Sequence, residues 1–336
     1  MFTIDSKSID ARLQAATLID LVIDRGGDIH HLLKGTSIFY EDILSGRCRI
    51  SLQQYIQLIR NASKLINSPE LSFLLGARLY PGNHALLHQA LINAPDLETG
   101  IALLLKYWQL LSPGLVPKVF YDDRHCYLYW LCLVNDEKVK RFLIEANFSG
   151  LTSMIRWLAG KKLPWQFVVS YREALHLEQY HVHLNRNVRF NGCMDLMVIS
   201  QEHLVSLWPR ASATTFQLSK QQLEQVVLVE KDNDLINEVY DFLWRSLPQR
   251  KNLALTADYL AMSPATLKRR LKNYHYTFQQ LLDEVLIHKA LYFFYAERLS
   301  NEEVAQRLNF HDVNNFRRSF KRWTGLTPSS FRQLWI

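Results

Sequence analysis

The sequence of 336 residues lacks the short motifs that mark the common catalytic and metal-binding sites. It contains no GxGxxG, Walker, GxSxG or HExxH sequence, so no motif indicates a dinucleotide site, a phosphate-binding loop, an esterase nucleophile or a zinc protease. The four cysteines, Cys48, Cys126, Cys132 and Cys193, have neither CxxC nor zinc-type spacing, and we expect buried reduced thiols. The sequence therefore predicts a protein that is not an enzyme and needs no metal or cofactor.

Long uncharged apolar segments are absent as well. The most apolar stretch, Ile101 to Leu111, is interrupted by Lys106 and is far shorter than the roughly 20 residues that span a bilayer. Met1 to Asp10 contains acidic residues and no apolar run typical of a signal peptide. No heptad pattern runs far enough to indicate a coiled coil. We expect a cytoplasmic protein without membrane contact. A homodimer is compatible with the sequence, but no pattern in the sequence specifies one.

Positive charge is concentrated in the last third of the chain. Residues 235–336 contain 15 lysines and arginines against nine aspartates and glutamates, a net charge of +6. The remaining residues contain 24 against 23, a net charge of +1. A surface that binds a polyanion is therefore expected in the C-terminal third, while the rest of the chain is electrically neutral.

This C-terminal third carries one helical pattern twice. Thr256–Met262 corresponds to Val304–Phe310 at a constant offset, and each segment is followed by a brief turn and a basic helix. Capping residues stand before every predicted helix, and a further capping box opens a connecting helix between the two copies. The pattern predicts two helix-turn-helix units joined by a long helix. The expected caps are Asn252, Ser263, Thr277 with Gln280, Ser300 with Glu303, and Asp312.

Helical spacing separates two faces on each basic helix. Leu267 and Leu271, like Phe316 and Phe320, fall on the face that packs against the preceding helix. The opposite faces carry side chains that suit the major groove of DNA, where arginine can pair with guanine and asparagine with adenine. We select eight candidates for base reading: Ala265, Lys268, Arg269, Lys272, Asn314, Arg317, Arg318 and Lys321. Thr266, Arg270, Asn315 and Arg322 lie at the flanks, where phosphate contacts are expected.

Two strings in this region, residues 260–271 and residues 316–332, resemble the DNA-binding domain of the AraC/XylS family of bacterial transcription regulators. The second, which runs from Phe316 through Trp323, Gly325 and Pro328 to Arg332, is the more specific. The resemblance implies that two recognition helices enter adjacent major grooves on one side of promoter DNA. Asn309 departs from the family pattern, which has glycine there, but asparagine tolerates positive φ next best after glycine.

The N-terminal two thirds predicts an α+β domain. Helices are expected over Asp10–Ile23, Ser51–Ile66, Asp96–Leu111 and about Val139–Leu158. A hairpin is expected from Val119 to Val134 with its turn at residues 122–125, and three short strands are expected at Gln166–Tyr171, Val188–Phe190 and Asp195–Ile199. The predicted fold is thus an α+β N-terminal regulatory domain plus an all-α C-terminal domain of two helix-turn-helix subdomains.

Segments of this domain resemble the arabinose-binding-like regulatory domain found in one branch of the same family. They are Leu32–Thr36, Gln54–Ala62, Leu74–Arg78 and Val188–Asn191. The resemblance implies a sensor for a small-molecule effector, but it does not establish a sugar, because effectors in the family include amino-acid catabolites and fatty acids. No set of lining residues can be selected from the sequence. The pairs His84 with His88 and His181 with His183 are better explained as ordinary packed or solvated side chains than as metal ligands.

Three classes of function remain in comparison. The first is a transcription regulator controlled by an effector, and the second is a regulator controlled by dimerisation or by a protein partner. The third, a repair enzyme that joins a similar DNA-binding unit to a four-cysteine zinc site, is disfavoured by the cysteine spacing. We predict a regulatory domain at residues 1–217, a linker at residues 218–234 and the DNA-binding domain at residues 235–336. An effector is expected to reorient the domains across Phe216–Asp234, changing DNA affinity or contact with RNA polymerase.

Overall fold

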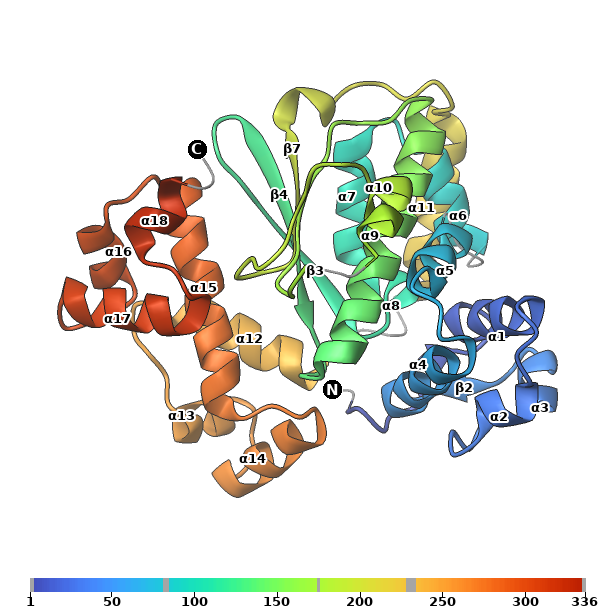
Figure 1. Cartoon of the computed structure of the whole chain (residues 1–336), viewed down its shortest axis with the longest axis horizontal. Coiled ribbons are helices and arrows are strands. Elements are labelled where there is room, and N and C mark those ends of the chain that lie inside the picture. Colours follow the sequence, from blue (N-terminus) through green and yellow to red (C-terminus); the bar gives the residue numbers. More distant parts are fainter. Residues whose placement is uncertain (1–2, 81–84, 174–175, 228–233, 334–336) are drawn as a thin grey trace.

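A computed structural model describes residues 3–80, 85–173, 176–227 and 234–333 of the chain. Figure 1 shows a regulatory domain built around one sheet and, beside it, a helical C-terminal domain. The first 111 residues are mainly helical, with one small antiparallel pair of strands, β1 (Ile9–Asp10) and β2 (Arg49–Ile50). The helices are α1 (Gln14–Asp24), α2 (Ile29–Leu33), α3 (Tyr40–Leu44), α4 (Leu52–Ile66), α5 (Leu71–Leu79), α6 (Ala85–Ile92), α7 (Leu97–Lys106) and α8 (Trp108–Leu111).

The central sheet has five strands in the order β3-β4-β7-β5-β6. Their bounds are β3 (Leu115–Tyr121), β4 (His125–Cys132), β5 (Gln166–Val168), β6 (Val188–Arg189) and β7 (Leu196–Ser200). All neighbours are antiparallel except β5 and β6. The predicted hairpin is confirmed, because Asp122 Oδ1 accepts hydrogen bonds from the backbone N–H groups of Arg124 and His125 and closes the turn between β3 and β4.

One face of the sheet packs on α9 (Glu137–Ala159), the longest helix of the regulatory domain. Trp130 of β4 and Phe167 of β5 contact Phe148 of α9, with ring centroids 5.1 and 5.5 Å away. On its outer side α9 meets α5 at very short range. A Cβ added to Gly76 of α5 would lie 1.9 Å from the carbonyl oxygen of Ala146. Only glycine therefore permits this approach of the two helices.

The C-terminal domain consists of seven helices in the described part of the chain, and the long helix α15 connects two pairs of short ones (Figure 1). They are α12 (Leu235–Ser246), α13 (Leu253–Tyr259), α14 (Pro264–Asn273), α15 (Phe278–Tyr295), α16 (Asn301–Arg307), α17 (Val313–Thr324) and α18 (Pro328–Gln333). This is the predicted arrangement of two helix-turn-helix subdomains and a linker helix. The predicted fold class is therefore confirmed for both domains.

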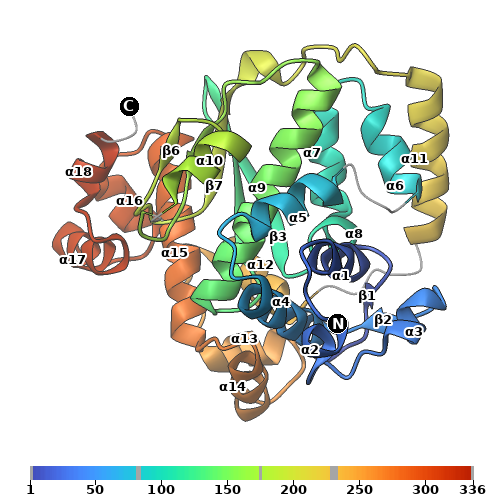
Figure 2. The ribbon, with the colours of Figure 1, turned by 45° about the vertical axis from the view of Figure 1, so that its right-hand side comes forward.

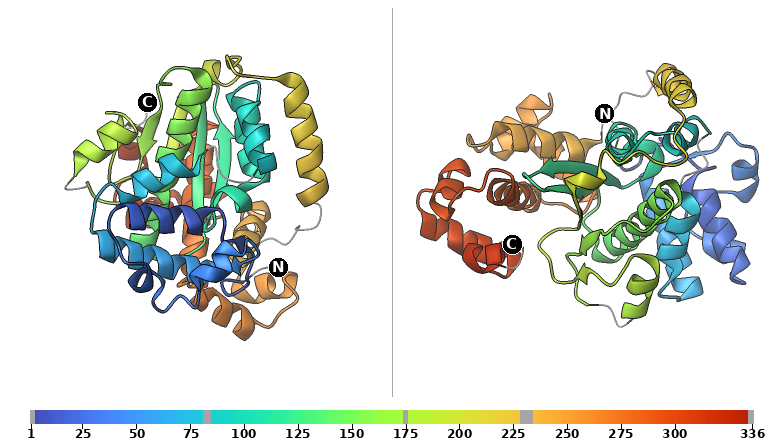
Figure 3. Two further views of the ribbon diagram at one scale, coloured as in Figure 1. Left: turned by 90° about the vertical axis from the view of Figure 1, so that its right-hand side faces the viewer. Right: turned by 90° about the horizontal axis from the view of Figure 1, so that it is seen from above.

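The second face of the sheet is covered by the C-terminal domain itself, chiefly by α15 and α12. Seen from above in Figure 3, the sheet lies between these helices on one side and α9 on the other. Tyr127 of β4 stacks on Tyr295 with ring centroids 5.6 Å apart, and Phe120 of β3 meets Tyr292 edge-on at 6.0 Å. Both aromatic residues of the strands are buried. The two domains therefore share a continuous apolar interface.

The predicted boundary between the domains falls within a helix. The predicted linker at residues 218–234 begins inside α11 (Ala213–Val227), which packs along α6 (Figure 2). Phe216, Ser219 and Leu223, which lie at helical spacing, are buried on one side of α11. A strand or helix end was expected at residues 226–229. Residues 226 and 227 are the last two residues of α11, and residues 228–233 lie outside the described part of the chain.

The other predicted elements are present with shifted ends. Asp96–Leu111 is divided into α7 and α8 at Tyr107, whose φ of −119° and ψ of 27° interrupt the helix while its ring is buried. Two elements complete the regulatory domain. They are α10 (Leu177–His183) and a short 3-10 helix at Gln201–His203.

Candidate nucleic-acid interface

Each of the two helix-turn-helix units is fixed by the predicted caps. In the first unit, the side chain of Asn252 accepts from Leu255 N–H at 2.9 Å and that of Ser263 accepts from Thr266 N–H at 3.1 Å. In the second unit, Ser300 and Glu303 form a reciprocal capping box, and Asp312 accepts from Asn315 N–H at 2.7 Å. These bonds satisfy N–H groups that a helix leaves unpaired at its start. All five predicted caps are confirmed, including Thr277 with Gln280 at the start of α15.

The turns between the paired helices have the same backbone conformation in both units. Ala261 has φ of 51° and Asn309 has φ of 57°, both in the left-handed region. The next residue closes the turn, because Met262 N–H donates to Ala257 O at 2.9 Å and Phe310 N–H donates to Ala305 O at 2.8 Å. The predicted positive φ of Asn309 is confirmed, and alanine occupies the corresponding position in the first unit.

The inner faces of α14 and α17 anchor these helices. Leu267, Leu271, Phe316 and Phe320 are fully buried, as the spacing predicted. Phe320 packs edge-on against Phe294 of α15 at 5.8 Å. Burial of side chains of this size contributes about 1.5–3 kcal/mol each, so the inner face fixes which side chains point outward.

All eight side chains selected as base-reading candidates lie exposed on the outer faces of α14 and α17. In Figure 1, α17 lies at the left of the C-terminal domain and α14 at its lower end. The residues on α14 are Ala265, Lys268, Arg269 and Lys272, and those on α17 are Asn314, Arg317, Arg318 and Lys321. The arrangement presents two basic helix faces to solvent.

Two of the arginines on α17 make exposed contacts with neighbouring side chains. Arg317 Nη2 lies 3.2 Å from Glu302 Oε1 of α16, and Arg318 Nη2 donates to Asn315 Oδ1 at 2.6 Å. Asn315 in turn donates to Asp312 Oδ2 at 2.6 Å. Exposed pairs of this kind contribute about 0–1 kcal/mol, so a phosphate or a base edge can replace them at little cost.

Arg250 connects the two units and was not found from the sequence. Its Nε–H donates to the carbonyl oxygen of Leu308 at 2.8 Å, and its guanidinium lies 4.1 Å from the ring centroid of Phe310. Burial lowers the pKa of Arg250. The segment before the first unit is thereby attached to the turn of the second. No helical pattern covers Arg250, so periodicity gave no signal for it.

A polar set links the regulatory sheet to α12 and α15. Lys118 Nζ of β3 lies 2.6 Å from Asp241 Oδ1 of α12, and both side chains are mostly buried. On α15, Glu284 Oε2 lies 3.0 Å from the hydroxyl of Tyr276, which is also 3.0 Å from the carbonyl oxygen of Cys132. Burial raises the pKa of Glu284, and the nearby ammonium of Lys140 offsets only part of this effect. Contact between the domains therefore has specific electrostatic partners as well as apolar area.

Within the described residues, no cluster of three or more histidine, cysteine or acidic side chains has a metal-binding arrangement. Of the histidine pairs, His84 lies outside the described residues, and His183 stacks on Phe73 at 5.2 Å. The four cysteines are free thiols; Cys126 and Cys132 are buried and the other two are partly buried. The described part of the chain also contains no helix with the length and apolar character that a membrane span requires.

Two basic helix faces, each held by a capped helix-turn-helix, define a DNA-binding transcription regulator. Family models extend this conclusion. The model described as the arabinose-binding domain of AraC transcription regulators matches residues 26–206, and a helix-turn-helix domain model matches residues 256–334. Because the first match alone covers more than half of the chain, the protein belongs to the AraC family of transcription regulators, with an arabinose-binding-like N-terminal domain.

Similar proteins are also regulators. The chain is 27% identical over 321 residues to the ornithine utilization regulator of Pseudomonas aeruginosa, and the alignment covers 95% of each protein. It is 32% identical over 81 residues to the regulator GadX of Escherichia coli, covering 24% of this chain and 30% of GadX. The crystal structure of the transcriptional regulator CdpR from Pseudomonas aeruginosa aligns with a TM-score of 0.45 at 18% identity, over 95% of this chain and 98% of that one.

Proposed function

We propose that α14 and α17 read two adjacent major grooves on one side of double-stranded promoter DNA. The observation that carries this proposal is the division of each helix into a buried apolar face and an exposed face with the candidate side chains. In this proposal, Arg269 and Arg318 form paired hydrogen bonds with guanine, and Asn314 forms them with adenine. The flanking residues Thr266 and Arg322 contact phosphates.

This assignment is tested with alanine variants of the full chain. DNA that the protein itself selects from a random pool serves as the ligand, and fluorescence anisotropy measures the affinity at moderate salt. Arg269→Ala and Arg318→Ala each lose about 1–3 kcal/mol of binding, because each removes a paired contact to one base. Arg47→Ala, an exposed arginine of the regulatory domain, is the matched control and keeps the parental affinity. Unchanged binding by both helix variants contradicts the assignment.

We place the division between the domains after α11. The regulatory domain then comprises residues 1–227, and the DNA-binding domain keeps its expected span of residues 235–336. Support comes from the packing of α11 along α6 and from Asp234, which caps α12 by accepting from Ile236 N–H at 2.8 Å. Limited proteolysis tests the division, and first cleavage between residues 213 and 227 contradicts it.

The regulatory domain is proposed to bind a small-molecule effector and to pass the signal to DNA through its contact with α12 and α15. The contact of β3 and β4 with these helices supports this route, because a ligand that alters the sheet changes the surface on which the linker helix rests. The expected reorientation across Phe216–Asp234 is thus proposed to begin at this interface. An effector must bind the two orientations with different affinities to shift them.

A thermal-shift screen of the full chain tests effector sensing. The name of the ornithine utilization regulator makes amino acids the first probes, followed by sugars, fatty acids and nucleotides. At a hundredfold excess over Kd, a ligand adds about 2.7 kcal/mol of stability, which raises Tm by several degrees. The alternative is control by dimerisation or by a protein partner, and this alternative is favoured if no compound in the screen raises Tm. A homodimer and a contact with RNA polymerase are further proposals, tested by ultracentrifugation and by transcription in vitro.

A further inference from the structure

A cleft of about 680 Å³ lies between the lobe of the regulatory domain that carries α10 and β6 and the end of the second recognition helix. His181, Arg186, Arg189 and the segment 190–193 form one wall. Thr324, Leu326 and Phe331 form the other, where α17 ends and α18 begins. Small-molecule sites typically measure about 300–1,000 Å³ and occur preferentially at domain interfaces. The cleft has the size and the location of such a site.

The charges along the cleft select for a particular ligand chemistry. Among the described residues that line the cleft, Arg186 and Arg189 carry positive charge and Glu173 carries negative charge. A guanidinium group pairs with a carboxylate through two parallel hydrogen bonds. Leu326 and Phe331 on the opposite wall offer apolar surface. A carboxylate that carries an apolar body therefore matches both walls of the cleft.

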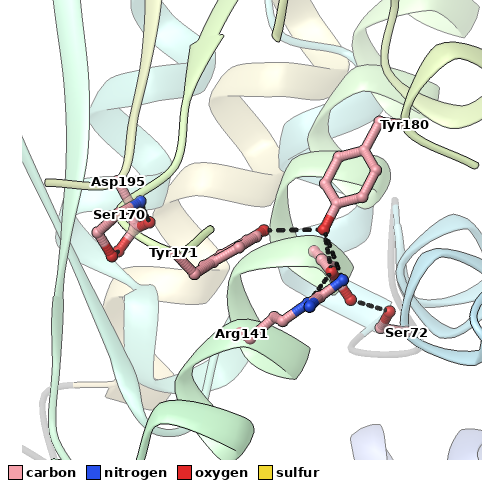
Figure 4. Close-up of polar contacts among 7 residues, drawn as sticks. Ser72, Arg141, Ser170, Tyr171, Tyr180 and Asp195 are labelled. Atoms are coloured by element: carbon pink, nitrogen blue, oxygen red, sulfur yellow. Dashed lines mark hydrogen bonds and ion pairs between the residues drawn. The ribbon is translucent and has the colours of Figure 1, made fainter. Parts of the chain in front are cut away.

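The regulatory wall is held by a buried polar network beneath it. The hydroxyl of Tyr180, on α10 directly before His181, donates to Glu145 Oε1 of α9 (Figure 4). Glu145 also accepts from Arg141 Nε–H at 2.8 Å and from the hydroxyl of Ser72 at 2.6 Å. Tyr180 is 1% exposed, so α10 is anchored firmly to α9. The cleft wall is therefore ordered before a ligand arrives, which reduces the entropy cost of binding.

On the regulatory side of the cleft, position 192 accepts only glycine. Gly192 N–H donates to Val169 O at 2.8 Å, and a Cβ at Gly192 would lie 2.4 Å from Cγ1 of Val168. Asn191, with φ of 59°, turns the backbone just before it. Ser170 of the adjacent segment is held by Asp195, which accepts from its N–H at 2.7 Å and from its hydroxyl at 2.9 Å. The loop that shapes the floor is thus defined by backbone geometry.

We infer that this interdomain cleft is the effector site and that it takes a small organic carboxylate with an apolar body. The inference rests on the effector sensing proposed above and gives it a location and a ligand class. A ligand in the cleft touches Thr324 and Leu326, on either side of Gly325, whose φ of 76° ends α17. Occupancy of the cleft therefore acts on the contact between the regulatory lobe and the second recognition helix.

The test uses the full chain and four variants in a thermal-shift titration. The probes are α-amino acids and straight-chain C4–C8 monocarboxylates, each paired with the amide of the same skeleton, together with neutral sugars and sugar phosphates. Arg186→Gln removes one cationic partner, and Leu326→Trp fills the cleft from the DNA-binding side. Arg47→Gln and Leu207→Trp repeat the same changes at exposed positions that do not line the cleft.

The expected result is a Tm increase with carboxylates and none with their amides. Arg186→Gln weakens the binding by about tenfold or more, because it removes a charge-assisted hydrogen bond. Leu326→Trp abolishes the binding, and both control variants retain it. Carboxylate binding that both cleft variants leave unchanged overturns the location while the sensing proposal stands. Binding of only sugars or sugar phosphates overturns the ligand class. A protein that binds none of these probes overturns this site and its ligand class, while the broader screen described above tests the sensing proposal.

Discussion

The pKa of His288 reports whether the regulatory sheet packs on the linker helix α15. It lies on α15, 3% exposed, with Nδ1 2.9 Å from the hydroxyl of Tyr240 and its ring 5.1 Å from that of Tyr129 on β4. Burial, together with the positive charges of Lys140 and Lys118 from the regulatory domain, lowers the pKa of His288 from 6.5 to about 3. Separation of the domains removes the two lysine charges and the part of the burial that the sheet supplies, and so moves this pKa back toward its ordinary value.

The sign of the pH effect follows from where the proton binds. Below pH 6.5 the unfolded chain protonates His288 while the folded, docked chain does not, so acidification favours unfolding. The contribution of the neutral imidazole is complete above about pH 6.5 and is lost progressively down to about pH 3. At about 1.4 kcal/mol per pH unit, it costs about 2 kcal/mol between pH 7.5 and pH 5.

Other buried groups act in the opposite direction, so the comparison must be made with a variant. Burial raises the pKa of Asp234 to about 6, and burial also raises that of Glu284, so each stabilises the fold as the pH falls. The difference in unfolding free energy between the parent and His288→Gln isolates the imidazole. Urea unfolding at pH 7.5, 6 and 5 measures this difference, and we expect the variant to gain about 2 kcal/mol relative to the parent at pH 5.

His311→Gln serves as the control, because the side chain of His311 is 94% exposed. It follows the pH dependence of the parent. Parallel loss of stability in His288→Gln and the parent refutes the reasoning, as does an imidazole NMR signal that is absent from His288→Gln and titrates near pH 6.5. Either result means that α15 is not covered by the sheet in solution.

Three further predictions concern the packing. Ala261→Gly raises the unfolding free energy by about 1 kcal/mol in urea titration, because it relieves a left-handed alanine; Asn309→Gly at the matching turn stays near zero, and equal effects contradict this. Arg250→Ala lowers the unfolding free energy by about 1–3 kcal/mol, because it removes the hydrogen bond to Leu308 and the contact with the Phe310 ring. The variant also selects DNA with a wider range of distances between the half-sites, and an unchanged range contradicts a bridging role of Arg250. Gly76→Ala costs about 1–3 kcal/mol or more in thermal unfolding, since its methyl group collides with the carbonyl of Ala146, and a neutral effect means that α5 and α9 are not in close contact.

The DNA-binding domain could be predicted from the sequence because its signals are local. Capping boxes such as Ser300 with Glu303 fix helix starts within four residues, and the spacing of Phe316 and Phe320 fixes the buried face. Arg250 was missed because its partners lie 58 and 60 positions further along the chain. A contact at that distance leaves no periodic pattern.

The regulatory domain could be predicted only as a list of elements. The hairpin of β3 and β4 was found because its turn and both strands are contiguous. The strand order, with β7 between β4 and β5, depends on pairings across long separations. The docking of the sheet on α15 was likewise hidden, since aromatic residues such as Tyr127 and Tyr295 show the same pattern in a core as at an interface. For this reason the sequence suggested no cleft between the domains.

The most direct measurement of the central claim is a comparison of the DNA sites that three proteins select from a random pool. The parent selects two half-sites whose centres lie about 10 base pairs apart, one for each recognition helix. Arg269→Ala loses base preference in one half-site only, and Arg318→Ala loses it in the other. Selection of a single half-site by the parent, or loss of preference at the same positions in both variants, contradicts the claim that α14 and α17 read adjacent grooves.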